Sequence, residues 1–243
     1  MGSTADMTTH ADEFWLFGYG SLIWKPPPHF DQRIPGWVSG YVRRFWQASQ
    51  DHRGTPDAPG RVVTLIDRSF WEQLDDHHGA APDRVWGVAY RIIPEKVAEV
   101  KDYLDIREIN GYTIHYTPFH PAAEPSSDAA APSPIRTLVY IGTPDNDQFV
   151  GPQDPQALAA HIRRSVGPSG LNTEYLFNLH EALENLSPES SDEHIRDLTE
   201  RVRAIIAAEE AGEIPADTPS TDKITPRPGH VHAAEEEQEE TEK

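Results

Sequence analysis

Short runs of Val, Ile, Tyr, Phe and Trp alternate with polar turns through the first half of the chain, which is the pattern of β-strands. Six such runs predict strands at 14–17, 40–47, 61–66, 85–92, 112–119 and 136–141. One helix interrupts them over 94–109. Pro94 suits its first position, and Val97, Val100 and Leu104 recur at helical spacing.

After Gly151 the apolar spacing becomes helical and predicts three helices, over 155–166, 173–186 and 191–208. The caps expected for them are Asp154 before Pro155, then Asn172 or Thr173, then Ser190 with Glu193 at capping-box spacing. Strands followed by helices indicate an α+β domain. We expect a small curled or closed sheet with helices packed outside it.

Composition divides the chain into a central domain and two polar ends. Residues 1–12 are polar and predict a disordered leader, and 13–211 form the domain. Pro, Thr, Asp and Glu dominate 212–243, which predicts a disordered acidic tail. The Ala/Pro/Ser-rich stretch 121–134 lies between two strands, so we expect a surface insertion there.

The charge balance and the missing cysteines exclude several classes of function. The chain has 40 acidic and 21 basic residues and a net charge of −19, which argues against nucleic-acid binding. Without Cys there is no disulfide, thiol nucleophile or Cys-ligated zinc. The histidines are scattered, so no metal site is expected. No apolar run approaches the roughly 20 residues of a membrane span, and no signal peptide is evident, so we expect a cytoplasmic protein.

The first candidate site is a glycine-rich turn. The apolar run 14–17 leads directly into Gly-x-Gly-Ser at 18–21. Two glycines let successive backbone N–H groups face one point, where they can hold a carboxylate or an oxyanion. The alternative is an ordinary turn after a strand, because the motif is short. The dinucleotide fingerprint is excluded because Ile23 stands at its third glycine.

Glu108 is the candidate general base. It stands four residues after Leu104 and eight after Val100, on the apolar stripe of the predicted helix. Burial and the negative helix end both favour a protonated carboxyl, so Glu108 would exchange protons nearer neutral pH than a free Glu. The alternative is a structural ion pair with one of three arginines, Arg44, Arg91 or Arg107.

A polar loop at 51–60 separates the second and third predicted strands. Arg53 within it and Arg61 just after it are candidates for substrate binding, because a guanidinium holds a carboxylate through two parallel hydrogen bonds. Ordering of the loop by these arginines is the alternative.

Several of these segments resemble, in chain order, the motifs of the ChaC-like γ-glutamylcyclotransferases. The resemblance spans about 14–200. It is carried by Phe17-Gly18-Tyr19-Gly20-Ser21-Leu22-Ile23-Trp24, Arg43-Arg44-Phe45-Trp46-Gln47, Asp51-His52-Arg53-Gly54-Thr55-Pro56, Pro59-Gly60-Arg61, Val85-Trp86-Gly87, Arg107-Glu108 with Gly111-Tyr112, Gly167-Pro168-Ser169-Gly170 and Glu174-Tyr175. Ile109-Asn110 departs from it, because the family usually has Lys-Gly there.

The resemblance implies a γ-glutamylcyclotransferase-like barrel that uses no cofactor. It implies a glutathione-specific lyase of glutathione catabolism, which converts glutathione into 5-oxoproline and Cys-Gly with Glu108 as general base. The γ-glutamyl group would bind to the loop formed by Gly18, Tyr19, Gly20, Ser21, Leu22 and Ile23. Tyr112 and Tyr175 are further candidates for substrate contacts.

Two alternatives remain open at this point. One is a cyclotransferase for other γ-glutamyl amines or amino acids, and the other is an inactive relative that binds a γ-glutamyl ligand. The oligomeric state is left open by the sequence.

Overall fold

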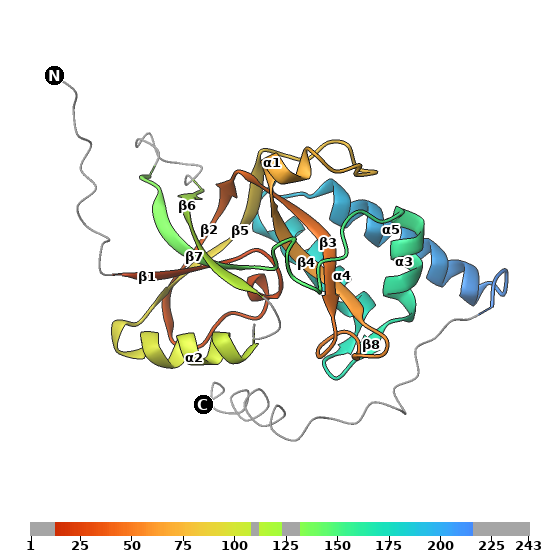
Figure 1. Cartoon of the computed structure of the whole chain (residues 1–243), viewed down its shortest axis with the longest axis horizontal. Coiled ribbons are helices and arrows are strands. Elements are labelled where there is room, and N and C mark those ends of the chain that lie inside the picture. The colour runs from red at the N-terminus through yellow and green to blue at the C-terminus, as the bar shows by residue number, and fades with distance from the viewer. Residues whose placement is uncertain (1–12, 108–111, 123–131, 216–243) are drawn as a thin grey trace.

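The computed structural model describes residues 13–107, 112–122 and 132–215 (Figure 1). Within them, a closed barrel has the strand order β1 (Phe14–Gly18), β5 (Arg84–Ile92), β2 (Phe30–Ser39), β6 (Thr113–Pro121) and β7 (Ile135–Ile141). Neighbouring strands are antiparallel except β1 and β7, which close the barrel in parallel at Leu16 and Leu138. Closure leaves no open sheet edge. The predicted α+β barrel is confirmed.

Strand β2 is not among the predicted strands. Pro35 and Gly36 stand in its middle, and both are unfavourable in most strands. Here the carbonyl of Pro35 accepts from Ala122, and Gly36 allows a close approach, since a Cβ there would lie 2.2 Å from the carbonyl oxygen of His120. Gly40, with φ +85, then forms the turn into the next strand, so the strand predicted from residue 40 begins at Tyr41.

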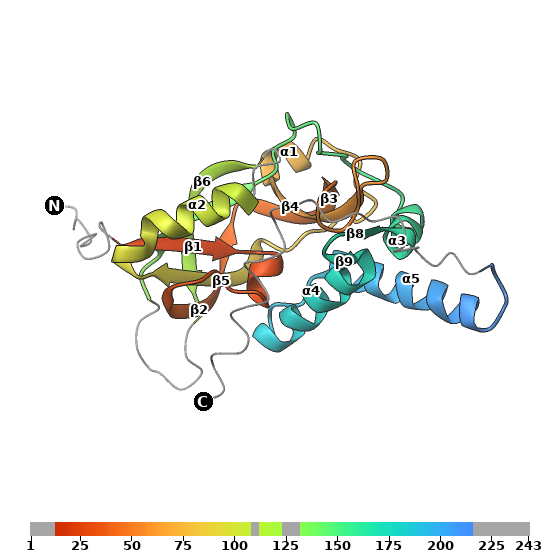
Figure 2. The ribbon, with the colours of Figure 1, turned by 90° about the horizontal axis from the view of Figure 1, so that it is seen from below.

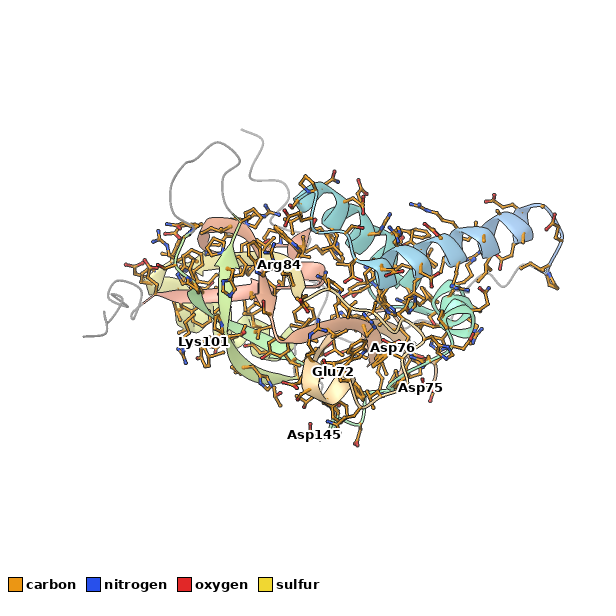
Figure 3. All side chains as sticks on the ribbon, turned by 90° about the horizontal axis from the view of Figure 1, so that it is seen from above. Glu72, Asp75, Asp76, Arg84, Lys101 and Asp145 are labelled. Atoms are coloured by element: carbon orange, nitrogen blue, oxygen red, sulfur yellow. The ribbon has the colours of Figure 1, made fainter. Side chains whose placement is uncertain are left out.

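Two predicted strands lie outside the barrel, in a separate two-stranded sheet of β3 (Tyr41–Ser49) and β4 (Gly60–Asp67). One face of this hairpin buries Val42, Trp46 and Ile66 against Trp71 of a short helix, α1 (Arg68–Trp71), that the pattern did not predict. Exposed acidic residues surround this helix, as Figure 3 shows for Glu72, Asp75 and Asp145. The other face carries Phe45 into the main core.

The helices cover the sheets from two sides (Figure 2). Helix α2 (Val97–Arg107), preceded by the 3-10 turn η2 (Pro94–Lys96), lies along the barrel and buries Val100 and Leu104 completely. The hairpin is flanked by α3 (Pro155–Arg164), α4 (Asn172–Leu186) and α5 (Glu193–Glu210). A minimal hairpin of β8 (Val166–Gly167) and β9 (Gly170–Leu171) joins α3 to α4.

Of the three predicted helix caps, one is confirmed and two are wrong. Asp154 caps α3 by accepting from Ala157 N–H at 2.8 Å. The amide of Asn172 does not cap α4, because it bonds both the N–H and the carbonyl of Arg61 at 2.7 Å. Helix α5 is capped by Asp192, while the Ser190 hydroxyl donates to the carbonyl of Leu183 instead.

Four of the predictions concern residues outside those that the structure describes: the leader 1–12, Glu108, most of the insertion 121–134 and nearly all of the tail 212–243. Among the described helices, none is long and apolar enough to cross a membrane. The described residues also contain no group of three or more side chains suited to hold a metal ion.

Candidate active site

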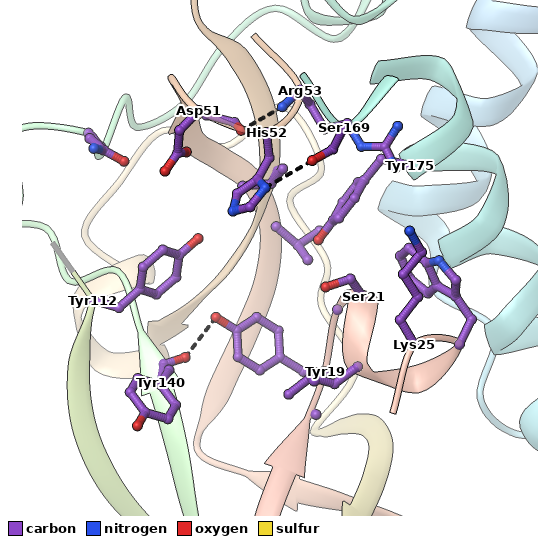
Figure 4. A pocket seen from close by; sticks show the side chains of 18 of the residues that line it. Tyr19, Ser21, Lys25, Asp51, His52, Arg53, Tyr112, Tyr140, Ser169 and Tyr175 are labelled. Atoms are coloured by element: carbon purple, nitrogen blue, oxygen red, sulfur yellow. Dashed lines mark hydrogen bonds between the residues drawn. The ribbon is translucent and has the colours of Figure 1, made fainter. Parts of the chain in front are cut away.

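A pocket of about 150 Å³ opens where the end of β1 meets the β3–β4 hairpin and helix α4 (Figure 4). Its walls come from distant parts of the chain. The turn after β1 forms one wall, the loop 51–53 forms another, and Tyr112, Tyr140 and Tyr175 close the sides. The side chains of Ser21, His52, Tyr112 and Tyr175 point toward its interior (Figure 4).

The glycine turn lines this pocket almost throughout. Gly18, Tyr19, Gly20, Ser21 and Leu22 all contribute to its wall. Of the loop residues predicted to bind the γ-glutamyl group, Ile23 alone does not line it, because its side chain is buried in the core at 4% exposure.

The turn folds back at once into the 3-10 helix η1 (Ser21–Ile23), with the carbonyl of Gly20 accepting from the N–H of Ile23 at 3.0 Å. At both glycines, a side chain would come too close to a neighbouring residue. A Cβ at Gly18 would lie 2.5 Å from the Cβ of Leu22, and one at Gly20 would lie 2.9 Å from the Tyr175 hydroxyl. In the described part of the chain, the N–H of Gly20 donates to no acceptor. A donor of this kind beside a pocket is available to a ligand anion.

Arg53 lines the pocket and is anchored there, with only 6% of its surface exposed. Its Nη1 donates to the carbonyl of Leu171 at 2.8 Å and to Glu174 Oε2 at 3.0 Å. The guanidinium lies 5.9 Å from the ring centre of Tyr175. Arg53 therefore orders the loop and holds α4 and Tyr175 in place, and it also presents positive charge to the pocket.

Arg61 lies away from the pocket. Its guanidinium donates to the carbonyls of Pro59 and Gly60, at 3.3 and 2.9 Å, and to the side chain of Gln153 at 3.3 Å. Burial, with a smaller contribution from nearby Arg164, lowers the pKa of this guanidinium. Arg61 had two predicted roles, substrate binding and ordering of the loop. Its contacts favour the second role.

The loop 51–60 is fixed against the β8–β9 turn. His52 Nδ1 lies 3.0 Å from the Ser169 hydroxyl, and Ser169 N–H donates to the His52 carbonyl at 2.9 Å. Gly167 makes this contact possible, because a Cβ there would lie 2.2 Å from the same carbonyl oxygen. The close packing at Gly167 therefore brings Ser169 and His52 together in the wall of the pocket.

Tyrosines make up much of the remaining wall. Tyr19 donates its hydroxyl to the carbonyl of Tyr140 at 2.9 Å, which joins the turn to strand β7. Tyr175 packs edge-on against Trp24 and Phe45, with ring centres 5.4 and 5.8 Å away. Tyr112 and Tyr175, which the resemblance suggested as substrate contacts, both line the pocket.

Sequence reasoning missed several pocket residues, among them Lys25, Tyr140 and Ser169. Ser169 had a signal, since it stands between the close-packed glycines of a quoted motif. No sequence signal marked Tyr140, because a Tyr within a predicted strand is an ordinary strand residue.

Glu108 lies outside the residues that the structure describes. The arginines of the ion-pair alternative are partly described. Arg44 holds Asp76 at 2.7 Å, and Arg91 holds Glu13 and Asp31 at 2.9 and 2.8 Å. Both therefore have carboxylate partners other than Glu108.

Comparison with known proteins gives a consistent result. The family model described as ChaC-like protein matches residues 14–205. A Schizosaccharomyces pombe protein named glutathione-specific γ-glutamylcyclotransferase is 45% identical over 78% of this chain and 92% of its own length. A human protein named glutathione-specific γ-glutamylcyclotransferase 1 is 37% identical over 79% of each chain.

Among solved structures, a yeast γ-glutamylcyclotransferase specific to glutathione is 39% identical. It covers 79% of this chain and 96% of that one, with a TM-score of 0.70. The similarity in sequence and in fold extends over the barrel, the hairpin and the helices that enclose the pocket. This chain therefore belongs to the ChaC-like protein family.

Proposed function

We propose that this chain is a glutathione-specific γ-glutamylcyclotransferase, a lyase that converts glutathione into 5-oxoproline and Cys-Gly. One observation carries the proposal: the glycine turn that resembles the family motif forms a wall of the pocket. Relatives 37–45% identical that bear this name support it. The pocket is small and lined by hydroxyl, imidazole and guanidinium groups, which suits a polar substrate with two carboxylates and an ammonium group.

In the proposed reaction, the substrate supplies its own nucleophile. Glu108 accepts a proton from the α-ammonium, and the free amine attacks the γ-carbonyl carbon. The new C–N bond closes a five-membered ring, and the carbonyl oxygen becomes an oxyanion. As the oxyanion collapses, the bond to the cysteinyl nitrogen breaks and Glu108 returns the proton to that nitrogen. The ring nitrogen then loses its second proton, so that 5-oxoproline carries a neutral lactam N–H and Cys-Gly departs with that proton as an ammonium. No water is consumed. Ring closure is intramolecular, so holding the substrate in the reactive conformation supplies much of the acceleration.

The backbone of the glycine turn is the proposed oxyanion site. Gly20 supports this role because its N–H has no acceptor in the described part of the chain and its residue lines the pocket. Backbone donors directed at a developing oxyanion lower the barrier because they are oriented before the charge appears.

Covalent geometry supports Glu108 as the base. It stands four residues before Tyr112, which lines the pocket. Four residues of chain span at most roughly 14 Å, so the backbone of Glu108 is within that distance of a pocket residue in any conformation. Two of the three arginines that offered it an ion pair hold other carboxylates.

Product analysis tests the proposal directly. Purified protein incubated with glutathione should release equal amounts of 5-oxoproline and Cys-Gly. Glutathione acetylated on its α-nitrogen should not react, because the nucleophile is blocked. Free glutamate as the first product would instead mean hydrolysis by water and would refute the cyclotransferase mechanism.

The substrate class needs its own comparison, because one relative, from Arabidopsis thaliana and 38% identical, is named only γ-glutamylcyclotransferase 2-3. We expect kcat/KM for glutathione to exceed the values for γ-glutamylcysteine, other γ-glutamyl amino acids and γ-glutamyl amines. Equal values would favour a general γ-glutamyl enzyme. Binding without turnover of any of them would favour the inactive relative.

We propose the cytoplasm as the site of the reaction, since glutathione keeps thiols reduced there.

A further inference from the structure

Arg43, on β3, is a charged residue buried directly behind the glycine turn. Only 2% of its surface is exposed. Its Nη1 donates to the carbonyl of Tyr19 at 3.1 Å, and its Nη2 donates to the carbonyl of Trp86. Its Nε lies 3.4 Å from the carboxylate of Asp192. Nε makes no hydrogen bond, but the ion pair with Asp192 balances the buried charge, and the bonds from Nη1 and Nη2 define the position of the guanidinium.

The position of Arg43 follows from where two strands separate. The ladder between β1 and β5 ends at the pair Gly18 and Val88. Beyond that pair, Arg43 connects the two segments by donating to one carbonyl of each, that of Tyr19 after β1 and that of Trp86 in β5. The guanidinium thus extends the connection between β1 and β5 past the last strand pair and into the pocket wall.

The carbonyl of Tyr19 belongs to the same peptide group as the N–H of Gly20. A trans peptide is planar, and its C=O and N–H point in opposite directions. Fixing the Tyr19 carbonyl toward Arg43 therefore fixes the Gly20 N–H away from Arg43. Glycine has wide backbone freedom, so Gly20 by itself does not hold this peptide in one orientation. An external anchor such as Arg43 is needed for that.

We propose that Arg43 is a positioning residue, which orients the Tyr19–Gly20 peptide so that the Gly20 N–H faces the reacting γ-carbonyl of the substrate. This inference rests on the function proposed above. Arg43 is not among the residues that line the pocket, so it would act on the substrate only through this peptide. Asp192 completes the arrangement, because it also accepts from the N–H groups of His194 and Ile195 at the start of α5. The orientation of the peptide is thereby tied to the beginning of that helix.

The neighbouring residue provides a matched control. Arg44 is equally buried at 2% exposure and is also paired with a carboxylate, Asp76, at 2.7 Å. Successive strand residues point to opposite faces, so Arg44 points toward the loop after α1 and contacts the carbonyls of His78 and Ala80. Its Nη1 donates to the main-chain carbonyl of Arg43 at 2.9 Å, and none of its hydrogen bonds reaches the glycine turn. Equivalent changes at 43 and 44 therefore separate the effect on the peptide from the cost of altering a buried arginine.

The test compares Arg43→Lys with Arg44→Lys. Lysine keeps the charge beside the carboxylate but lacks the fork that binds two carbonyls at once. We expect Arg43→Lys to lower kcat for 5-oxoproline formation by about 10- to 100-fold with KM changed less than about threefold, because the lost interaction acts on the transition state. Arg44→Lys should retain kcat near the wild-type value. Equal losses of kcat in the two variants, or none at Arg43→Lys, would overturn the proposal.

A second measurement does not depend on turnover. With ¹⁵N-glycine labelling, the amide resonance of Gly20 is identified by its loss in Gly20→Ala. It should move in Arg43→Lys and stay in place in Arg44→Lys. An unmoved resonance in Arg43→Lys refutes the positioning role. If the wild-type protein formed no 5-oxoproline, the proposed function would fail, and this resonance would still decide whether Arg43 orients the peptide.

Discussion

Gly20 and Tyr175 approach each other so closely across the pocket that a Cβ at Gly20 would lie 2.9 Å from the Tyr175 hydroxyl. The two residues come from opposite walls, one from the turn after β1 and the other from α4. Tyr175 has little room to retreat, because it is 7% exposed and packs against Trp24 and Phe45. The width of the pocket at this point therefore depends on the absence of a side chain at Gly20.

Gly20→Ala should lower kcat/KM for glutathione by at least about tenfold, since the added methyl group narrows the pocket and displaces the Tyr175 hydroxyl. Steady-state kinetics and a melting curve measure the effect. Gly79→Ala is the matched control, because Gly79 is exposed and a Cβ there meets nothing within 4 Å. Wild-type kinetics in Gly20→Ala would show that the substrate does not use this part of the pocket.

Glu108→Gln should lower kcat by about 10²- to 10⁴-fold, the usual contribution of a general base, because the amide cannot accept the α-ammonium proton. Its melting temperature should stay close to that of the wild type. The control is Glu99→Gln on α2, whose carboxylate is 56% exposed and pairs with Lys96 and His29 at the surface. That change should leave kcat intact. If Glu108→Gln unfolded the protein, a structural ion pair would be the better explanation.

His194 should make stability depend on pH. Its Nε2 accepts from Phe45 N–H at 3.1 Å, so the proton must lie on Nδ1, which faces His78 Nδ1 at 3.2 Å. Protonation would set two donors against each other. Burial, followed by the charges of Arg44, His78 and Arg43, places the pKa of His194 well below its usual 6.5.

The sign follows from proton uptake. Below pH 6.5 the unfolded chain binds a proton at residue 194 that the folded chain does not. The contribution of neutral His194 to the free energy of unfolding is therefore fully present above this pH, and it is lost as the pH falls toward the folded pKa. We expect the melting temperature to drop on the order of 3–6 °C between pH 7 and pH 5.5.

His194→Gln should be less stable at pH 7.5 but should show a flatter pH profile than the wild type. His161, whose pKa is also lowered mainly by burial, contributes in the same direction, so the difference between the two profiles is the informative quantity. His77→Gln is the control at an exposed histidine and should retain the wild-type profile. Identical slopes in His194→Gln and the wild type would contradict this assignment.

Removal of residues 216–243 should leave kcat unchanged and the melting temperature within about 2 °C, because the segment has little apolar surface to bury. The end of α5 is complete without it, since Gly212, with φ +72, and Glu213 donate to the carbonyls of Glu209 and Ala208. Differential scanning calorimetry and the product assay measure both quantities. A large loss in either would mean that the tail takes part in folding or catalysis.

Much of the local structure was predictable because it depends on spacing along the chain. Runs rich in β-branched and aromatic residues located most strands, and helical spacing located α2 through Val100 and Leu104, both of which are fully buried. The cap at Asp154 was predictable because an Asp-Pro pair suits a helix start in almost any context. The glycine turn was also evident, since its motif is contiguous.

Where a residue had several ways to satisfy its hydrogen bonds, only long-range contacts decided between them. Asn172 bonds the backbone of Arg61, 111 positions away, in place of capping its own helix. Strand β2 was not predicted because it contains Pro35 and Gly36. Both are tolerated there, since the carbonyl of Pro35 accepts a hydrogen bond just after β6 and Gly36 lets the backbone of β6 approach closely.

The sequence by itself determined the α+β class, the family and the glycine turn that lines the pocket. The tertiary structure alone decided that β3 and β4 leave the barrel, that Arg61 lies away from the pocket, and that Tyr140 and Ser169 line it. The physical reason is that periodicity records which face of an element is buried, but not what it is buried against. Barrel closure and the packing of α4 determine which surfaces pack together. This packing places Arg43 behind the Tyr19–Gly20 peptide.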